Sequence, residues 1–396
     1  MSEREQESTE TDVLQAFRRA VDAMNVGRHE EARRALRDLT EEAPGFTWAW
    51  QEMTQAALRS GSHRELEEEL RRQGKQRPNE PGPRHALGYL SRRLGRPVAK
   101  TRRYLQSALE RDAACWPAAM ELAALDIDMG RPERAEPKFR SLQETFSRLG
   151  DLWGEATALN YQGHVARARF DYAAALTIYP RVMKLKMAVG DLAGAAGALS
   201  NLGLLALEVG EHRESLKYFR DSLELQERVG DRVGSAHVMI LMAAAHEDRG
   251  RLEDARSLLR VAQRVVRQLG HERLLVYVLV NQAHVALRGR RFSRAEALLK
   301  EALGEAERIG MAREQAGAQL YLSSLARERG RLEEAEAGLA RAKSLSRRSR
   351  DRLHRVAVAT EEAALALRRG EPARALRAAR FAMRLHAQHR GLGGGL

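Results

Sequence analysis

Glycine recurs at fixed intervals along the second half of this chain, and this regularity constrains the fold more than any other feature. The blocks are 40 residues long and start at Gly150, Gly190, Gly230, Gly270, Gly310 and Arg350. Three of them open with Gly-Asp, in which glycine ends one helix in the left-handed conformation and aspartate caps the next. A second turn signal lies twenty residues into each block, as in GEHRESL from Gly210. Each block is therefore predicted to be a helix, a turn and a helix.

Apolar and small residues occupy the same positions in successive blocks, with the i, i+4, i+7 spacing of one helical stripe. In the first helix the rows are Leu159, Leu199, Met239, Leu279; then Gly163, Gly203, Ala243, Ala283, Ser323, Ala363; then Ala166, Ala206, His246, Ala286, Ala326, Ala366. In the second helix they include Ala175, Ser215, Ala255, Ala295, Ala335, Ala375 and then Tyr179, Phe219, Leu259, Leu299, Leu339, Ala379. Small residues in such rows allow two helices to approach closely, which predicts tightly packed helix pairs.

The first half carries the same unit in a shorter form, with steps of 34, 34 and 35 residues between the turns at Gly27, Gly61, Gly95 and Gly130. With this shorter unit included, the chain resembles the tetratricopeptide repeat family. Trp50 holds the family's early aromatic position, Pro44 and Pro78 its terminal proline, and Leu87-Gly88 and Leu202-Gly203 its Leu-Gly pair. The resemblance covers about residues 12 to 390. It implies an all-α, right-handed superhelical α-solenoid of about ten helix-turn-helix repeats.

The repeats divide the chain without any break in composition. We expect a flexible acidic tail over residues 1–11, four short repeats over 12–149 and six longer repeats over 150–390. The second array is expected to continue the first, and residues 391–396 to form a flexible Gly-rich tail. The change of period near residue 150 is expected to alter the curvature.

Cysteine content and hydropathy favour a soluble, cytoplasmic protein. Cys115 is the single cysteine, so no disulfide framework is possible. The N-terminus lacks the apolar run of a secretory signal, and the apolar runs Val238–Ala245 and Leu274–Val280 are too short to span a bilayer. The net charge is +13, but arginine is this chain's default polar residue, which weakens basicity as a sign of nucleic-acid binding.

Motifs for catalysis, cofactor binding or metal binding are almost absent. GRPVAKT at 95–101 ends like a phosphate loop but lacks the glycine before the lysine and lies at a turn between helices. His386 and His389 are three apart on the last helix, with no third metal ligand nearby in sequence. The sequence thus predicts no enzyme, no cofactor and no metal.

The surface left for function is the second face of the first helices, which line the inside of the superhelix in the family that this chain resembles. It is predicted to form a groove that binds a protein or peptide segment, with an apolar floor and polar edges. The alternative is that these side chains pack against neighbouring repeats. The candidates are Asn160, His164, Arg167, Ser200, Leu204, Leu207, Ile240, Tyr277, Val280, His284, Leu287 and Leu320.

The C-terminal repeat offers a second candidate site. Residues 341–390 carry a net charge of +10, and Arg374, Arg377, Arg380 and Arg384 form one helical stripe. This stripe either binds an anionic partner, including nucleic acid, or is the solvated outer face that a terminal repeat needs. The first interpretation of the chain is a scaffold or adaptor, and the alternative is a regulatory or nucleic-acid-associated protein. A monomer and a homodimer both fit the sequence.

Overall fold

The computed structural model describes residues 3–349 and 352–390, and side chains over 11–347 and 354–385. These residues form helices joined by short turns, with no strand in the part of the chain so described. The helices of the first half are α1 (Glu3–Asn25), α2 (His29–Glu42), α3 (Thr47–Ser60), α4 (His63–Gln76), α5 (Gly82–Arg93), α6 (Val98–Leu109), α7 (Trp116–Asp128) and α8 (Pro132–Leu149). The second half continues with α9 (Leu152–Ala168), α10 (Tyr172–Ala188), α11 (Leu192–Glu208), α12 (His212–Arg228), α13 (Arg232–Asp248) and α14 (Leu252–Gln268). The remaining helices are α15 (Glu272–Arg288), α16 (Phe292–Ile309), α17 (Ala312–Glu328), α18 (Leu332–Ser349), α19 (Arg352–Arg368) and α20 (Pro372–Arg390).

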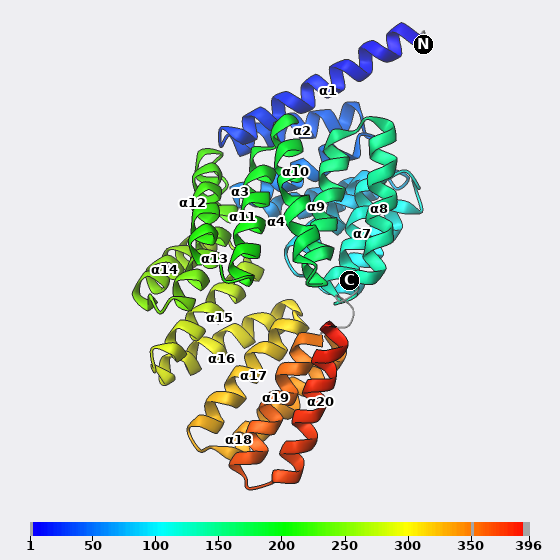
Figure 1. The fold of residues 1–396 in the computed structure, drawn as a ribbon. Helices are drawn as coiled ribbons and strands as arrows, with labels where there is room; N and C mark the ends of the chain where they lie inside the picture. The colour runs from blue at the N-terminus through cyan, green and yellow to red at the C-terminus, as the bar shows by residue number, and fades with distance from the viewer. Residues whose placement is uncertain (1–2, 350–351, 391–396) are drawn as a thin grey trace.

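The helices pack as consecutive antiparallel pairs, which confirms the predicted all-helical solenoid (Figure 1). Residues 3–11, expected to be a flexible tail, instead form the first turns of α1. The second expected tail, 391–396, lies outside the described residues. The two arrays adjoin directly, because α8 packs against α9.

The Gly-Asp pairs form the turns between repeats, as predicted from the sequence. Gly190 and Gly230 have φ of +78° and +65°, the left-handed region that a residue with a Cβ avoids. Asp191 Oδ1 then accepts a hydrogen bond from Gly194 N at 2.8 Å, and so caps α11. Asp231 caps α13 in the same way through Gly234 N, also at 2.8 Å. Each pair therefore ends one helix and starts the next.

Within a repeat, the small row of the first helix faces a large residue of the second. A Cβ added at Gly203 would lie 2.6 Å from the ring of Phe219, and one at Gly163 would lie 2.6 Å from the ring of Tyr179. Where the first helix has Ala243 instead, the second carries the smaller Leu259, and both belong to one buried cluster. In these repeats a smaller residue in one row thus faces a larger one in the other, as close packing of the helix pair requires.

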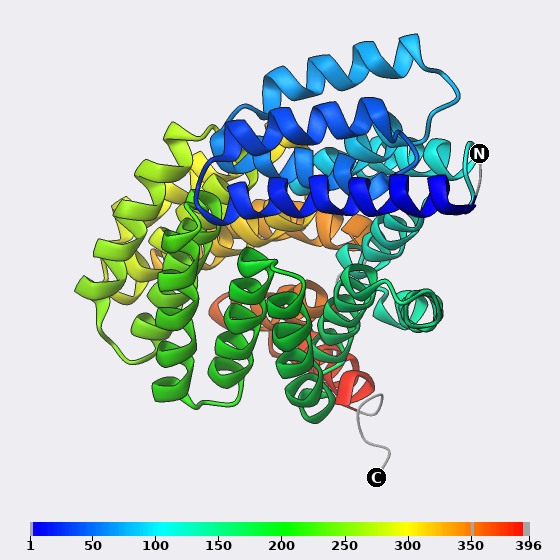
Figure 2. The same ribbon diagram turned by 90° about the horizontal axis from the view of Figure 1, so that it is seen from above.

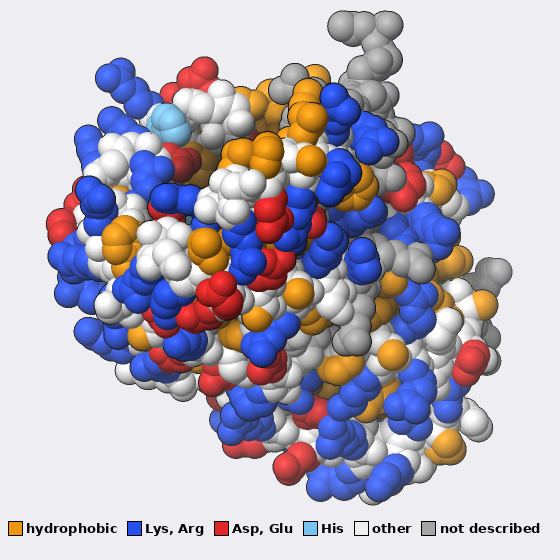
Figure 3. All heavy atoms as spheres, turned by 90° about the horizontal axis from the view of Figure 1, so that it is seen from below, with side chains coloured by type: hydrophobic (Ala, Val, Ile, Leu, Met, Phe, Trp, Pro, Cys, Tyr) orange, Lys and Arg blue, Asp and Glu red, His pale blue; other side chains and the backbone are white. Residues whose placement is uncertain are grey.

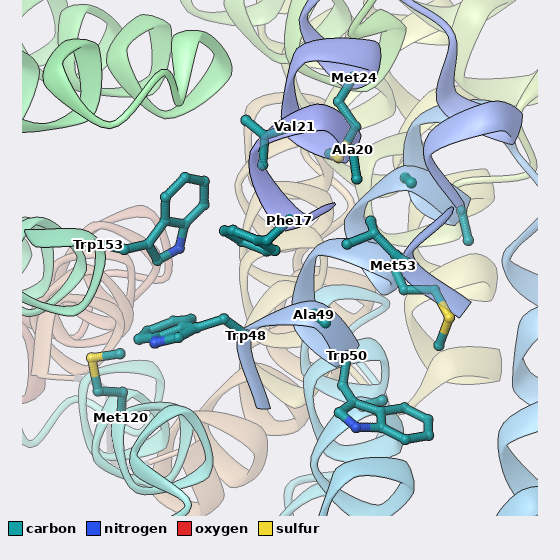
Figure 4. Close-up of a cluster of buried hydrophobic side chains, with 14 of the residues drawn as sticks. Phe17, Ala20, Val21, Met24, Trp48, Ala49, Trp50, Met53, Met120 and Trp153 are labelled. Atoms are coloured by element: carbon teal, nitrogen blue, oxygen red, sulfur yellow. The ribbon is translucent and has the colours of Figure 1, made fainter. Parts of the chain in front are cut away.

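The first repeats also contact the second array. Phe17 of α1 packs edge-on against Trp153 of α9, with ring centroids 5.2 Å apart. Figure 4 shows Phe17, Trp48 and Trp153 facing one another, although they come from α1, α3 and α9. The chain therefore winds round so that its beginning is buried against its middle (Figure 2).

Three pairs of turns meet along this contact. The turn at Gly27 lies against Gly230, the turn at Gly61 against Leu269, and the turn at Gly95 against Met311. Each step advances by one short repeat in the first array and one long repeat in the second. The 34-residue and 40-residue units are thus in one-to-one register across the superhelix, although their helices differ in length.

Candidate interaction face

The first helices of successive repeats lie closer together than the second helices. Contacts join α5 to α7, α7 to α9, α11 to α13, α13 to α15 and α17 to α19, whereas second helices mainly contact the first helices beside them. In a curved array, the more closely spaced helices are on the inner side. The predicted candidate residues therefore lie on helices of the inner side.

Polar side chains join α9 to α11 on this side. Asn201 Nδ2 donates to Asn160 Oδ1 at 3.3 Å, and Asn160 Nδ2 lies 3.3 Å from His164 Nε2. Arg167 Nη1 forms an ion pair with Glu208 Oε1 at 2.8 Å. Burial lowers the pKa of His164 to about 3, so this imidazole is neutral at physiological pH. This end of the inner side is a hydrogen-bonding surface.

A second group joins α15 to α17. His284 packs edge-on against Tyr321, with centroids 4.2 Å apart, and Tyr277 donates through its hydroxyl to Glu314 Oε1 at 2.9 Å. Burial lowers the pKa of His284 and raises that of Tyr277. Val280, Leu287 and Leu320 are half-buried beside them. This end combines apolar side chains with aromatic and polar ones.

Two of the predicted residues are in the helix packing instead. Ser200 is buried between α11 and α12, where its Oγ lies 2.7 Å from Ser222 Oγ. Ile240 is buried in the cluster that joins α13, α14 and α15, because its position lies under the next first helix. Neither side chain presents a surface to a partner here. Leu204 and Leu207 are half-buried and pack partly against the cluster around Phe219.

The inner face is defined here by the ten candidates that keep accessible surface. They are Asn160, His164, Arg167, Leu204, Leu207, Tyr277, Val280, His284, Leu287 and Leu320.

The first array contributes a charged network that the sequence analysis missed. Arg92 of α5 bonds through Nε to Asp128 Oδ2 at 2.8 Å and through Nη1 to Glu121 Oε2 at 3.0 Å. Tyr161 of α9 donates to Glu121 Oε1 at 2.6 Å. Burial acts to raise the pKa of Glu121, but the charges of Arg92 and Arg93 hold it below its usual value. The available signal was the run MELAALDID, in which acids interrupt an otherwise apolar helix.

The basic stripe on α20 is only partly available for binding. Arg374 is neutralised by Glu336 at 2.7 Å and Glu371 at 3.1 Å, because the preceding repeat places Glu336 beside it. Arg377, Arg380 and Arg384 are exposed. Figure 3 shows that basic side chains on the face seen from below are interleaved with acidic and apolar ones rather than gathered in one patch. His386 and His389 lie outside the described side chains.

The described residues contain neither a metal-binding cluster nor a membrane-spanning helix. Among these residues, no group of three or more His, Cys, Asp or Glu is arranged to hold a metal ion. No described helix is both long and apolar enough to cross a membrane.

Comparison with known proteins identifies the repeat. A sequence model described as tetratricopeptide repeat matches residues 194–268, which cover α12, α13, α14 and most of α11. No curated protein matches the chain in sequence.

Several solved structures share the fold at low sequence identity. A Rap protein complexed with competence and sporulation factor aligns with a TM-score of 0.58 and 10% identity, covering 86% of this chain and 99% of that one. A signal-transduction ATPase with a tetratricopeptide repeat sensor, from Pyrococcus horikoshii, aligns at 0.53 and 16%, covering 92% of this chain and 53% of that one. The APC/C hetero-tetramer Cut9–Hcn1 aligns at 0.53 and 15%, covering 72% and 52%.

The chain spans about half the length of the last two of these proteins. At such identities the likeness concerns the fold alone. The match shows tetratricopeptide repeats over residues 194–268, and antiparallel helix pairs of the same kind continue the α-solenoid on both sides of them.

Proposed function

We propose that this protein is a non-catalytic scaffold or adaptor that binds a peptide or helical segment of a protein partner along the inner face. The observation that carries the proposal is the mixture of groups on that face. Half-buried apolar side chains such as Leu287 and Leu320 lie among polar groups that retain hydrogen-bonding capacity.

This mixture suits an amphipathic polypeptide. Half-buried leucines supply apolar area, while the polar side chains beside them fix the register of a bound backbone or side chain. The Rap protein that shares the fold is complexed with competence and sporulation factor, which supports a solenoid of this kind as a binding scaffold.

The proposal is tested by placing a photo-crosslinking amino acid at single positions and exposing the protein to an extract of its own cells. Leu287 is the inner-face position, and Val261 is the matched control because it is an exposed aliphatic residue on α14. We expect one protein to be captured at position 287, with capture competed by excess unlabelled protein. Equal capture at both positions, or capture at 261 alone, would rule out the inner face as the binding surface.

A further inference from the structure

A cavity of about 320 Å³ lies between α12 and α13, beside the turn that joins α13 to α14. Its floor is apolar, made by Leu216 and Met242, both of which are buried. Its rim carries four arginines, Arg213, Arg220, Arg249 and Arg251, and His246 completes the lining. No residue of the inner face takes part in it.

The four guanidinium groups are exposed, and none forms an ion pair or a hydrogen bond with any residue that the structure describes. The charges of Arg220, Arg249 and Arg251 act on His246. Burial lowers the pKa of His246, Asp254 acts to raise it, and Arg251, Arg249 and Arg220 lower it further. The Nδ1 atom of this histidine has no hydrogen-bond partner, and its nearest carboxylate oxygen, on Asp254, is 3.8 Å away. The cavity therefore collects positive charge with little compensation.

Other repeats of the same chain show how the equivalent arginines are paired where a carboxylate is present. In the repeats from Gly130 onward, the position of Leu216 is held by glutamate at Glu136, Glu296 and Glu336, by leucine at Leu176 and Leu376, and by arginine at Arg256. Each of these glutamates pairs with the arginine equivalent to Arg249. The pairs are Glu136 with Arg169, Glu296 with Arg329 at 2.6 Å, and Glu336 with Arg369 at 3.0 Å.

Glu296 pairs with the largest number of these basic side chains. It also pairs with Arg331 at 3.0 Å and Lys300 at 2.8 Å, which are the equivalents of Arg251 and Arg220. Leu216 thus removes the one carboxylate that would neutralise three of the four arginines. His246 is a second departure at the same cavity, since the other 40-residue repeats have Ala166, Ala206, Ala286, Ala326 and Ala366 there.

We propose that this cavity binds a phosphate monoester, whose phosphoryl group takes the place of the missing carboxylate and whose organic body lies on Leu216 and Met242. Phosphate suits the site better than a carboxylate for two reasons. Its charge at neutral pH is about −1.5 to −2, and it has three strong acceptor oxygens, enough to engage several guanidinium groups at once. An apolar floor under the charged rim favours an ester with an aromatic or aliphatic body over inorganic phosphate.

The test uses phenyl phosphate as the probe and isothermal titration calorimetry as the measurement, with inorganic phosphate for comparison. We expect saturable 1:1 binding of phenyl phosphate and weaker binding of inorganic phosphate, which lacks the contact with the floor. Leu216→Glu introduces the carboxylate found in three other repeats, so it should keep the fold and weaken binding by roughly tenfold or more. Arg249→Gln with Arg251→Gln should weaken it similarly without altering the floor.

The control is Arg228→Gln with Arg264→Gln, which removes two exposed arginines of α12 and α14 that do not line the cavity. It lowers the net charge by the same amount as the cavity double variant and should leave binding unchanged. Replacing phenyl phosphate by a phosphotyrosine peptide distinguishes the source, because a protein-borne phosphate should bind more tightly than the small ester. The site is overturned by non-saturable binding, by full binding in a folded Leu216→Glu protein, or by equal losses in the control.

Discussion

Arg59, in the last turn of α3, forms a buried ion pair with Asp231, the residue that caps α13, with Nε 3.1 Å from Oδ2. The other carboxylate oxygen of Asp231 accepts the capping hydrogen bond from Gly234 N. Asp151 is used in the same double way, since Oδ1 caps α9 while Oδ2 accepts from Trp48 Nε1 at 3.1 Å. The capping aspartates of the second array therefore also attach the first array to it.

Arg59→Gln should loosen this attachment. Breaking a buried pair leaves Asp231 charged without its partner, which costs about 3–5 kcal/mol. We expect a lower midpoint of urea unfolding and a larger radius of gyration by X-ray scattering, because the turn contacts lie beside this pair. The control is Arg267→Gln, which removes an exposed pair with Glu301 and should cost less than about 1 kcal/mol. Equal effects of the two substitutions would show that the buried pair does not hold the arrays together.

Two glycines of α11 should respond in opposite ways to alanine. Gly203→Ala places a methyl group 2.6 Å from the Phe219 ring and should destabilise the fold by about 1–3 kcal/mol. Gly197 has no atom within 4 Å of the added Cβ, so Gly197→Ala should stabilise the helix by about 0.5–1 kcal/mol. Chemical denaturation of both variants measures the difference. Destabilisation at both positions would contradict the complementary rows of small and large residues.

Buried neutral histidines should make the protein sensitive to mild acid. Burial lowers the pKa of His85 and His271 to about 4 and that of His164 to about 3, whereas their ordinary value is 6.5. The unfolded chain takes up protons below about pH 6.5 and the folded chain does not. The stability from these groups is therefore complete above about pH 6.5 and is lost as the pH falls toward 4.

His85→Leu tests this directly, because His85 is fully buried and neither ring nitrogen has a partner in the part of the chain that the structure describes. Urea midpoints at several pH values between 5 and 7.5 give the slope of stability against pH. Removing one such proton-binding group should reduce that slope by up to about 1.4 kcal/mol per pH unit. An unchanged slope would show that His85 is not held neutral in the folded state.

The fold was predictable because every repeat carries the same turn residues and the same spacing of apolar residues. Gly-Asp turns and the rows at Gly203 and Phe219 depend on contacts within a repeat, where sequence spacing and spatial distance correspond. The register between arrays depends on curvature, which sums small rotations over several repeats and leaves no periodic pattern. The contact of Arg59 with Asp231 was therefore invisible, although the capping role of Asp231 was not.

The inner face was predicted less well for a related reason. Positions three residues apart on a helix border both the inner side and the next helix, and a small rotation decides between them. Ser200 and Ile240 fell on the packed side, whereas Leu287 and Leu320 kept accessible surface. The arginine cavity was not predicted because no motif marks it. It depends on Leu216 standing where some repeats carry glutamate while the arginines that such a glutamate would pair with are still present.

The last prediction separates binding at the inner face from binding at the basic stripe of α20. Arg374 is held by Glu336 and Glu371, so three arginines of the stripe remain for an anionic partner. If a nucleic acid bound there through three phosphates, its affinity should fall about 40-fold between about 50 and 200 mM salt. A polypeptide on the half-buried leucines of the inner face should show far weaker dependence, because apolar burial is not screened. We therefore expect the protein captured at Leu287 to bind with almost the same affinity at both salt concentrations. Changing Arg377, Arg380 and Arg384 to glutamate should leave that affinity unchanged. A steep salt dependence that this triple variant abolishes would transfer the binding function from the inner face to α20.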